Sequence, residues 1–266
     1  MARTALLNVM VQAVLKAGRG LTRDFGEVEN LQVSLKGPGD FVSAADRRAD
    51  EVLIAELRKA RPGYSFLTEE SGVIAGSDET HRWIIDPLDG TTNFLHGIPL
   101  FAISVAMEHE GQLVAGVIFN PILNELYVAE RGSGAFLNDH RLRVAARRNL
   151  ADCVIATGLP GIGRRIHDVA LPEINRMMPK LAGLRRSGSA ATDLAWVASG
   201  RLDGYWEHGV NPWDVAAGIV LVREAGGIIT DTEGEGEMFD TRSVVAGNEV
   251  VHAAILDNIT AAHTVA

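Results

Sequence analysis

The sequence predicts an α+β or layered α/β fold with two β-sheets, from the kind and order of its apolar segments. The first half contains strand-like runs that follow one another with short turns between them, at residues 82–85, 102–108, 113–119 and 125–129. Successive strands joined by short turns favour an antiparallel sheet. The second half alternates strand-like runs with helix-like segments, which favours helices packed in layers on a sheet.

Individual elements are expected where the apolar spacing changes and turn residues follow. Residues 4–18 carry apolar side chains at helical spacing, and this helix can continue past Gly20. The run 33–36 is strand-like, and a helix at 44–60 is stopped by the sequence 61–63. In the second half we expect strands at 154–157, 204–207, 228–230 and 244–246, and helices at 167–178, 190–199, 211–225 and 249–263.

The bulk composition is that of an ordinary globular protein. The 266 residues are 47% hydrophobic and 22% charged. We therefore expect one domain over 1–266, with possible lobes at 1–148 and 149–266. Because the formal net charge is −9, the surface would repel phosphates, and direct nucleic-acid binding is not expected. An anionic substrate stays compatible, since bound cations can reverse the local field.

The cysteine content and the N-terminus bear on the compartment. Cys153 is the one cysteine, so an intrachain disulfide is impossible and a reducing compartment is expected. Because Cys153 lies in an apolar run, we expect a buried structural thiol. The N-terminal residues lack the apolar core of a signal peptide, and no run of about 18 apolar residues predicts a membrane span. The expected location is the cytoplasm.

The segment Asp86–Asn93 is the strongest candidate for chemistry. Two carboxylates, Asp86 and Asp89, follow an apolar strand-like run, and Pro87 makes the chain turn between them. Such a turn can direct both carboxylates and a backbone carbonyl to one point, which suits a hard divalent cation. A short helix beginning after Gly90 would offer its N-terminus to a phosphate. A lone Asp-Pro-x-Asp sequence is more often a polar turn with a helix cap, but the full octet carries more information.

Two further acidic elements lie elsewhere in the chain. Glu69 and Glu70 follow a strand-like run, and adjacent acids there point in different directions, so one can face a site. Asp214 lies at the third position of an expected helix, after Asn211 and Pro212, where an acid can be a simple helix cap. That helix is apolar on most faces, however, and a carboxylate on a buried helix requires a partner.

Taken together and in this order, these motifs resemble the inositol monophosphatase family. The similarity extends over most of the chain, through residues 35–36, 40–46, 66–71, 83–94, 213–218 and 224–227. Its most specific parts are Asp86-Pro87-Leu88-Asp89-Gly90-Thr91 and Trp213-Asp214-Val215-Ala216-Ala217-Gly218. The resemblance implies an αβαβα sandwich, usually assembled as a homodimer. It also implies magnesium-dependent, lithium-sensitive hydrolysis of a phosphate monoester, with myo-inositol 1-phosphate as the leading substrate.

The resemblance further implies which residues bind metal. Glu69, Asp86 and the carbonyl of Leu88 correspond to ligands of a first Mg²⁺ ion. Asp86, Asp89 and Asp214 correspond to ligands of a second, and a third, weaker ion would share Glu69. Two or three ions per site are therefore expected, and Mn²⁺ can substitute. The ions would reverse the repulsion between these carboxylates and a phosphate ester.

Catalytic and substrate-binding roles follow from the same resemblance. Asp46 and Thr91 correspond to the pair that orients and deprotonates the attacking water, with Glu69 counted beside them as catalytic. Gly90 and Thr91 would hold the phosphate through their N–H groups, and Lys36 matches a loop lysine. The expected substrate contacts are Gly90, Thr91, Ser189, Ala190, Glu207 and Asp214.

The choice of alcohol stays open at this point. The segment 158–165, which varies among family members, is rich in glycine and offers few hydroxyls. Alternatives are a related sugar phosphate, histidinol phosphate or a phosphoadenosine nucleotide, although Glu207 favours a polyol over an adenine ring. Arg185 and Arg186 are expected at the solvent or at a dimer interface. Some bacterial relatives also act as protein partners in RNA synthesis, so an added interaction role is a further alternative.

Overall fold

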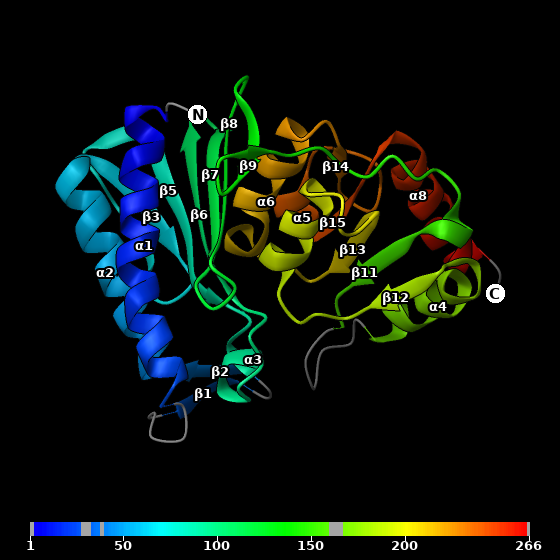
Figure 1. Ribbon diagram of the computed structural model, residues 1–266, viewed down its shortest axis with the longest axis horizontal. Coiled ribbons are helices and arrows are strands. Elements are labelled where there is room, and N and C mark those ends of the chain that lie inside the picture. Colours follow the sequence, from blue (N-terminus) through cyan, green and yellow to red (C-terminus); the bar gives the residue numbers. More distant parts are fainter. Residues whose placement is uncertain (1–2, 28–32, 38–39, 160–166, 265–266) are drawn as a thin grey trace.

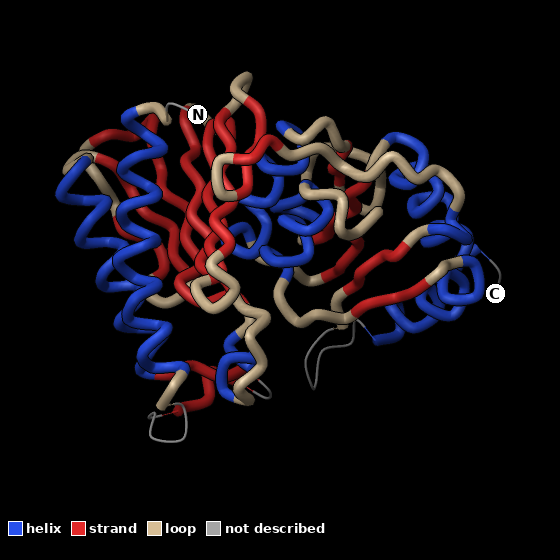
Figure 2. The backbone as a smooth tube through the Cα atoms, viewed as in Figure 1, coloured by secondary structure: helices blue, strands red, loops and turns tan. Residues whose placement is uncertain are grey.

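The computed structural model describes residues 3–27, 33–37, 40–159 and 167–264. Two large sheets lie one beside the other along the molecule, with helices between them and on both outer sides (Figure 1). The first sheet comes from the first half of the chain and the second sheet from the second half (Figure 2).

The first sheet has the strand order β10-β9-β8-β7-β6-β5-β3-β4. Neighbouring strands are antiparallel, except that β3 and β5 are parallel. Its strands are β3 (Tyr64–Thr68), β4 (Gly72–Ile74), β5 (Asp78–Asp89), β6 (Ala102–His109), β7 (Gln112–Asn120), β8 (Glu125–Glu130), β9 (Gly134–Leu137) and β10 (His140–Arg141). Two long helices, α1 (Ala5–Phe25) and α2 (Ala44–Ala60), cover its outer face, and a small hairpin of β1 (Val33–Gly37) and β2 (Asp40–Ser43) precedes α2.

The second sheet has the strand order β12-β11-β13-β15-β14. These strands are β11 (Val154–Thr157), β12 (Gly183–Arg185), β13 (Gly204–His208), β14 (Ile228–Thr230) and β15 (Ser243–Gly247). Helices α5 (Ala190–Ala198) and α6 (Pro212–Glu224) lie between the two sheets, while α4 (His167–Met177) and α8 (Glu249–Thr264) cover the outer face. The short helices are α3 (Thr91–Leu95), α7 (Met238–Thr241), η2 (Leu150–Asp152) and η3 (Met178–Lys180). The layers therefore run α, β, α, β, α, which confirms the predicted sandwich.

Alternation along the strands divides the core into layers. On β5, Ile84 faces the central helices, whereas Trp83 and Ile85 face α1 and α2. The central helix α6 is buried on nearly all sides, because both sheets and α5 surround it. Close packing there depends on Gly116, since a Cβ at this position would lie 2.6 Å from the carbonyl oxygen of Ala217. The two halves thus share one core around α6.

Most of the predicted elements are present with small shifts at their ends. The first helix does continue past Gly20, and the second has the predicted bounds 44–60. Short elements such as β4, β9, β10 and β12 carry too few residues for a periodic signal. Cys153 is fully buried, as expected, and burial raises the pKa of its thiol to about 11. Among the described residues, no helix is long and apolar enough to cross a membrane.

Candidate active site

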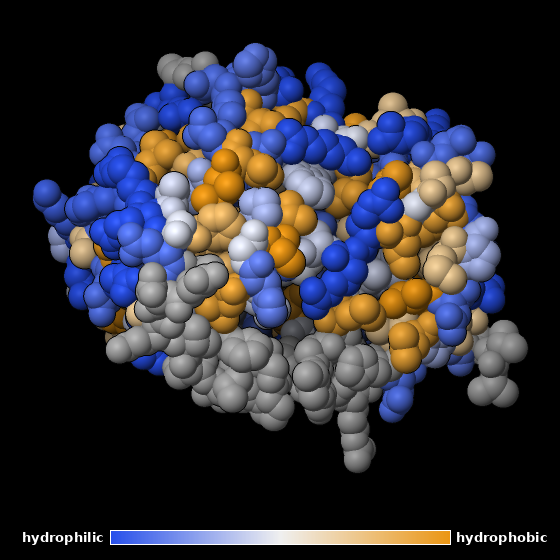
Figure 3. Space-filling view, turned by 60° about the horizontal axis from the view of Figure 1, so that its bottom comes forward, coloured by the Kyte–Doolittle hydropathy of each residue, from blue (hydrophilic) through white to orange (hydrophobic). Residues whose placement is uncertain are grey.

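All the predicted site residues except Asp46 line one polar cavity of about 210 Å³. The cavity lies where the end of β5 approaches β13 and the N-terminal ends of α5 and α6. Its lining includes Glu69, Asp86, Leu88, Asp89, Gly90, Thr91, Ser189, Ala190, Glu207 and Asp214. The side of the molecule that carries α3 is turned forward in Figure 3, where both hydrophilic and hydrophobic side chains are exposed. The structure thus gathers the acidic elements that are dispersed in the sequence.

The acidic loop is shaped by the irregular end of β5. The β5–β6 register shifts between Asp86 and Asp89, so the chain leaves the regular ladder there. Asp86 is 2% exposed, and its Oδ1 accepts a hydrogen bond of 2.9 Å from the N–H of Leu88. Gly90 has φ 95° and precedes the short helix α3. A Cβ at Gly90 would also lie 3.0 Å from the carbonyl oxygen of Leu100, so the loop packs tightly.

Asp46 and Thr91, predicted as a pair, are in direct contact. The Thr91 hydroxyl donates to Asp46 Oδ1 at 2.9 Å, although the two residues are 45 positions apart in the sequence. Ser43, the N-cap of α2, donates its N–H to Asp46 Oδ2 at 2.8 Å. Burial raises the pKa of Asp46, and the hydrogen bonds from Ser43 and Thr91 partly oppose this effect. Both carboxylate oxygens of Asp46 therefore accept hydrogen bonds, Oδ1 from Thr91 and Oδ2 from Ser43.

Asp89 joins the acidic loop to the second half of the chain. Its Oδ2 accepts hydrogen bonds from the Ser189 hydroxyl at 2.6 Å and from the N–H of Ala191 at 2.7 Å. Asp89 thus binds the N-terminal end of α5, which favours a negative charge. Nearby, Asn93 Nδ2 donates to the carbonyl oxygen of Ser187 at 2.8 Å. Burial raises the pKa of Asp89 to about 7, and Glu207 and Glu69 contribute to this rise.

The carboxylates of the cavity destabilise one another when all are charged. Burial raises the pKa of Asp86 well above its ordinary value, and Glu69, Asp89 and Asp214 raise it further. The pKa of Asp214 is also raised, by burial first and then by Asp89, although the N–H of Asn211 donates to its Oδ2 at 2.7 Å. A bound cation would offset the cost of burying these negative charges, and it would reduce the repulsion between them.

The acidic wall of the cavity, formed by Glu69, Asp86, Asp89 and Asp214, carries oxygen donors that fit a hard divalent cation. These four acidic residues and Leu88 line one cavity, and carboxylate and carbonyl oxygens are the ligands that Mg²⁺ prefers. The Leu88 carbonyl oxygen lies 3.1 Å from the Thr91 hydroxyl, which can donate to it as well as to Asp46. Within the described residues, no three His, Cys, Asp or Glu side chains are already close enough to hold an ion by themselves.

Glu207 lies on the wall contributed by β13. Its Oε2 accepts a hydrogen bond from the hydroxyl of Tyr205, on the same face of the strand. The carboxylate occupies the space above Gly158, where a Cβ would lie 1.7 Å from Glu207 Cδ. Asp193 also lines the cavity, is 2% exposed, and accepts a hydrogen bond of 2.6 Å from the Ser187 hydroxyl. The Glu207 carboxylate can therefore lie in this position because residue 158 has no side chain.

Several residues of the site were not predicted. Ser43, Tyr205 and Asp193 resemble ordinary capping or core residues in the sequence. In the fold, Asp193 lines the cavity, Ser43 binds Asp46 and Tyr205 binds Glu207. Arg186 is exposed to solvent, as expected, and it also lines the cavity, which was not predicted. Residues 160–165 of the variable segment lie outside the described residues, as does the side chain of Lys36.

Comparisons with known proteins agree with this architecture. The profile described as "Inositol monophosphatase family" matches residues 2–264. The "Inositol-1-monophosphatase" of Mesorhizobium japonicum is 63% identical over 256 residues, which cover 96% of either chain. The "Nus factor SuhB" of Escherichia coli K12 is 42% identical over 254 residues, covering 96% of this chain and 95% of the relative. The crystal structure of "extragenic suppressor protein suhB" from Bartonella henselae has a TM-score of 0.94 at 57% identity, covering 96% of this chain and 98% of that one.

Proposed function

Because this chain belongs to the inositol monophosphatase family, we propose that it hydrolyses myo-inositol 1-phosphate to inositol and phosphate. The observation that supports this most is the cavity that unites Asp86, Asp89 and Asp214 with Glu207. Three carboxylates on one wall suit cations that would attract a phosphate. A fourth carboxylate faces them and can accept hydrogen bonds from the hydroxyls of a polyol.

The family is generally metal-dependent, and we propose Mg²⁺ as the ion, with two or three per site. Glu69, Asp86 and the carbonyl of Leu88 would hold one ion, and Asp86, Asp89 and Asp214 another. When bound, the ions supply Lewis acidity that lowers the pKa of water and neutralises phosphate charge. Asp89 Oδ2 is already bound to α5, so its other oxygen is the one available for a metal.

The attacking water would be oriented by Thr91 and Asp46. Because the Thr91 hydroxyl donates its own proton to Asp46, its oxygen can still accept a hydrogen bond from a water molecule. Asp46 can then receive a proton relayed through that hydroxyl, and the raised pKa of Asp46 makes its carboxylate a better base. Ser43 fixes the other oxygen of Asp46, so the pair needs little reorganisation.

The substrate would be held at two ends. Gly90 and Thr91 begin the turn into α3, and their N–H groups would bind the phosphate. The polyol ring would lie near the N-terminal end of α5, beside Ser189 and Ala190. Glu207 and Asp214 would accept its hydroxyl hydrogens.

A substrate panel tests this proposal. Phosphate release is measured from myo-inositol 1-phosphate, fructose 1,6-bisphosphate, histidinol phosphate and a 3′-phosphoadenosine nucleotide, with and without Mg²⁺. We expect the highest kcat/KM for the inositol ester, dependence on Mg²⁺ and inhibition by Li⁺. A folded protein that releases no phosphate from the inositol ester in Mg²⁺ would refute the proposal, and a higher kcat/KM for another ester would replace the substrate.

A second candidate function is an interaction with the RNA-synthesis machinery, favoured by the similarity to a relative named "Nus factor SuhB". The variant Asp89→Asn separates the two functions, since it should abolish hydrolysis. If a cellular defect of a deletion strain were corrected by this variant, an interaction role would be supported. We also propose a homodimer, which light scattering of the purified protein can test.

A further inference from the structure

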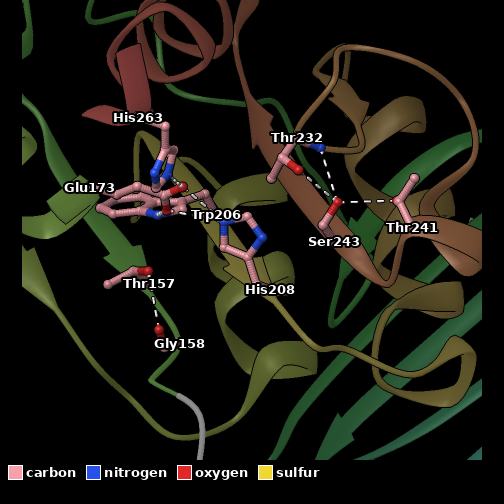
Figure 4. A network of polar contacts seen from close by, with 9 residues as sticks. All are labelled: Thr157, Gly158, Glu173, Trp206, His208, Thr232, Thr241, Ser243 and His263. Carbon is pink, nitrogen blue, oxygen red and sulfur yellow. Dashed lines mark hydrogen bonds and ion pairs between the residues drawn. The ribbon is translucent and has the colours of Figure 1, made fainter. Parts of the chain in front are cut away.

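A buried carboxylate outside the cavity joins three elements of the second half. Glu173, on α4, is 1% exposed and accepts a hydrogen bond of 3.0 Å from Trp206 Nε1. The Nε2 atoms of His208 and His263 each lie 3.0 Å from its Oε1. Figure 4 shows both imidazole rings and the indole ring gathered around this carboxylate. Glu173 therefore ties α4 to β13 and to the last turn of α8.

Two of the three partners flank Glu207 on the same strand. Side chains alternate along a strand, so Trp206 and His208 face α4 and α8, while Tyr205 and Glu207 face the central helices, where Glu207 lines the cavity. Accordingly, Tyr205 packs in the central core and Trp206 in the outer core. Trp206 and His208 are the chain neighbours of Glu207, so their contacts with Glu173 hold the backbone on either side of Glu207.

The network is stiff because its acceptor is charged and shielded from water. Hydrogen bonds to an ionised carboxylate are about twice as strong as neutral ones. Hydrogen bonds from His208, His263 and Trp206 lower the pKa of Glu173 against the effect of its burial. The carboxylate thus stays ionised near neutral pH, and it holds both rings of β13 at fixed positions. On the cavity side, the Glu207 carboxylate occupies the space that a Cβ at Gly158 would fill.

From this arrangement we propose that Glu173 is a positioning residue for substrate recognition, which acts through Glu207. It fixes the end of β13 from the outer face, so that the Glu207 carboxylate meets the polyol hydroxyls without reorganisation. The last turn of α8, through His263, becomes part of the same support. The kinetic part of this inference rests on the proposed function, whereas the placement of Glu207 does not.

The test is a double-mutant cycle between Glu173→Gln and Glu207→Gln. Gln has the shape of Glu, but its amide nitrogen cannot accept a hydrogen bond, so this variant removes the charge and the ring contacts made by one of the two oxygens. We expect Glu173→Gln to lower kcat/KM for myo-inositol 1-phosphate about tenfold, mostly through KM. In the Glu207→Gln background the same change should alter kcat/KM less than about twofold, because the two residues act as a unit. Asp168→Asn, on the exposed side of α4, is the matched control and should leave both constants unchanged.

Other outcomes would overturn the proposal. Equal losses in both backgrounds would show that Glu173 acts only on the fold, and an unchanged KM in the single variant would exclude positioning. If Glu173→Gln does not fold, His263→Ala removes one donor from a side chain that is 42% exposed, and the same cycle applies. A crystal structure of either variant decides the question even if the wild-type protein is inactive on inositol phosphate. A Glu207 carboxylate that leaves its place at Gly158 supports the proposal, and one that stays contradicts it.

Discussion

Replacing Gly158 by alanine tests the placement of Glu207 with the smallest possible change. An alanine Cβ would lie 1.7 Å from Glu207 Cδ and 1.9 and 2.1 Å from its two carboxylate oxygens. Ordinary contact begins at 3.4 Å, so the carboxylate must retreat by about 1.7 Å. Because the displaced atoms are the end of a flexible side chain, and φ of Gly158 is not in the left-handed region, the fold should accommodate the change.

The expected loss follows from the hydrogen bonds that Glu207 would no longer make. A hydrogen bond to a charged group contributes about 1.5–3 kcal/mol. Each 1.36 kcal/mol is a factor of ten in rate, so we expect kcat/KM for myo-inositol 1-phosphate to fall roughly ten- to hundredfold. The retreating carboxylate also gives up its hydrogen bond from Tyr205, which adds to the disorder of the site.

The assay is steady-state phosphate release at saturating Mg²⁺, with circular dichroism to show that the variant is folded. Gly20→Ala is the matched control, because a Cβ at Gly20 meets nothing within 4 Å. This control should leave kcat/KM unchanged. A folded Gly158→Ala variant with kcat/KM within about twofold of the wild type would refute the role given to Glu207.

Three further predictions address catalysis, metal binding and stability. Thr91→Val removes the hydroxyl that donates to Asp46 and should lower kcat about a hundredfold or more. Thr91→Ser keeps a hydroxyl at this position and should retain most of the wild-type kcat. Equal rates of phosphate release by the two variants would contradict the pairing of Thr91 with Asp46. Burial raises the pKa of Asp89 from 3.8 to about 7, so between these pH values the folded, metal-free protein holds a proton that the unfolded chain has released. The Tm in EDTA should therefore fall as the pH rises through this window, and Mg²⁺ should reverse the fall. Asp89→Asn should make the fall less steep without abolishing it, because the pKa values of Asp86 and Asp214 are raised as well. A slope unchanged by Asp89→Asn would contradict the contribution given to Asp89. Asp203→Ala leaves the N–H of Val154 without its 2.8 Å acceptor, so the free energy of unfolding measured in urea should fall by about 1–3 kcal/mol. An unchanged urea midpoint would contradict this prediction and would show that water replaces the carboxylate.

The long elements could be predicted because their patterns are local. Helix α2 begins after Ser43 and ends before the Arg61-Pro62-Gly63 sequence, and both signals are visible without the fold. Strand β12 was missed, because Gly183–Arg185 is too short for a periodic pattern and pairs only with β11. The parallel pairing of β3 with β5 inside a mostly antiparallel sheet also depends on long-range contacts.

The acidic residues around Asp86 could be predicted better than the part of the cavity around Glu207. Asp86, Asp89 and Asp214 stand in dense local motifs, whereas Tyr205 and Asp193 look like residues of a strand and a helix. The bond between Asp89 and Ser189 joins residues 100 positions apart, and no local signal indicates it. Long-range packing of α5 against the acidic loop creates that contact, so a single sequence could not reveal it.

We propose above that the acidic wall of the cavity holds the divalent cations needed for catalysis. The most direct measurement is the anomalous diffraction of crystals soaked in Mn²⁺, which takes the same oxygen ligands as Mg²⁺. We expect anomalous peaks between the carboxylates of Asp86, Asp89 and Asp214, in contact with Glu69 and the Leu88 carbonyl. Occupied sites elsewhere, with no peak at this wall, would contradict it.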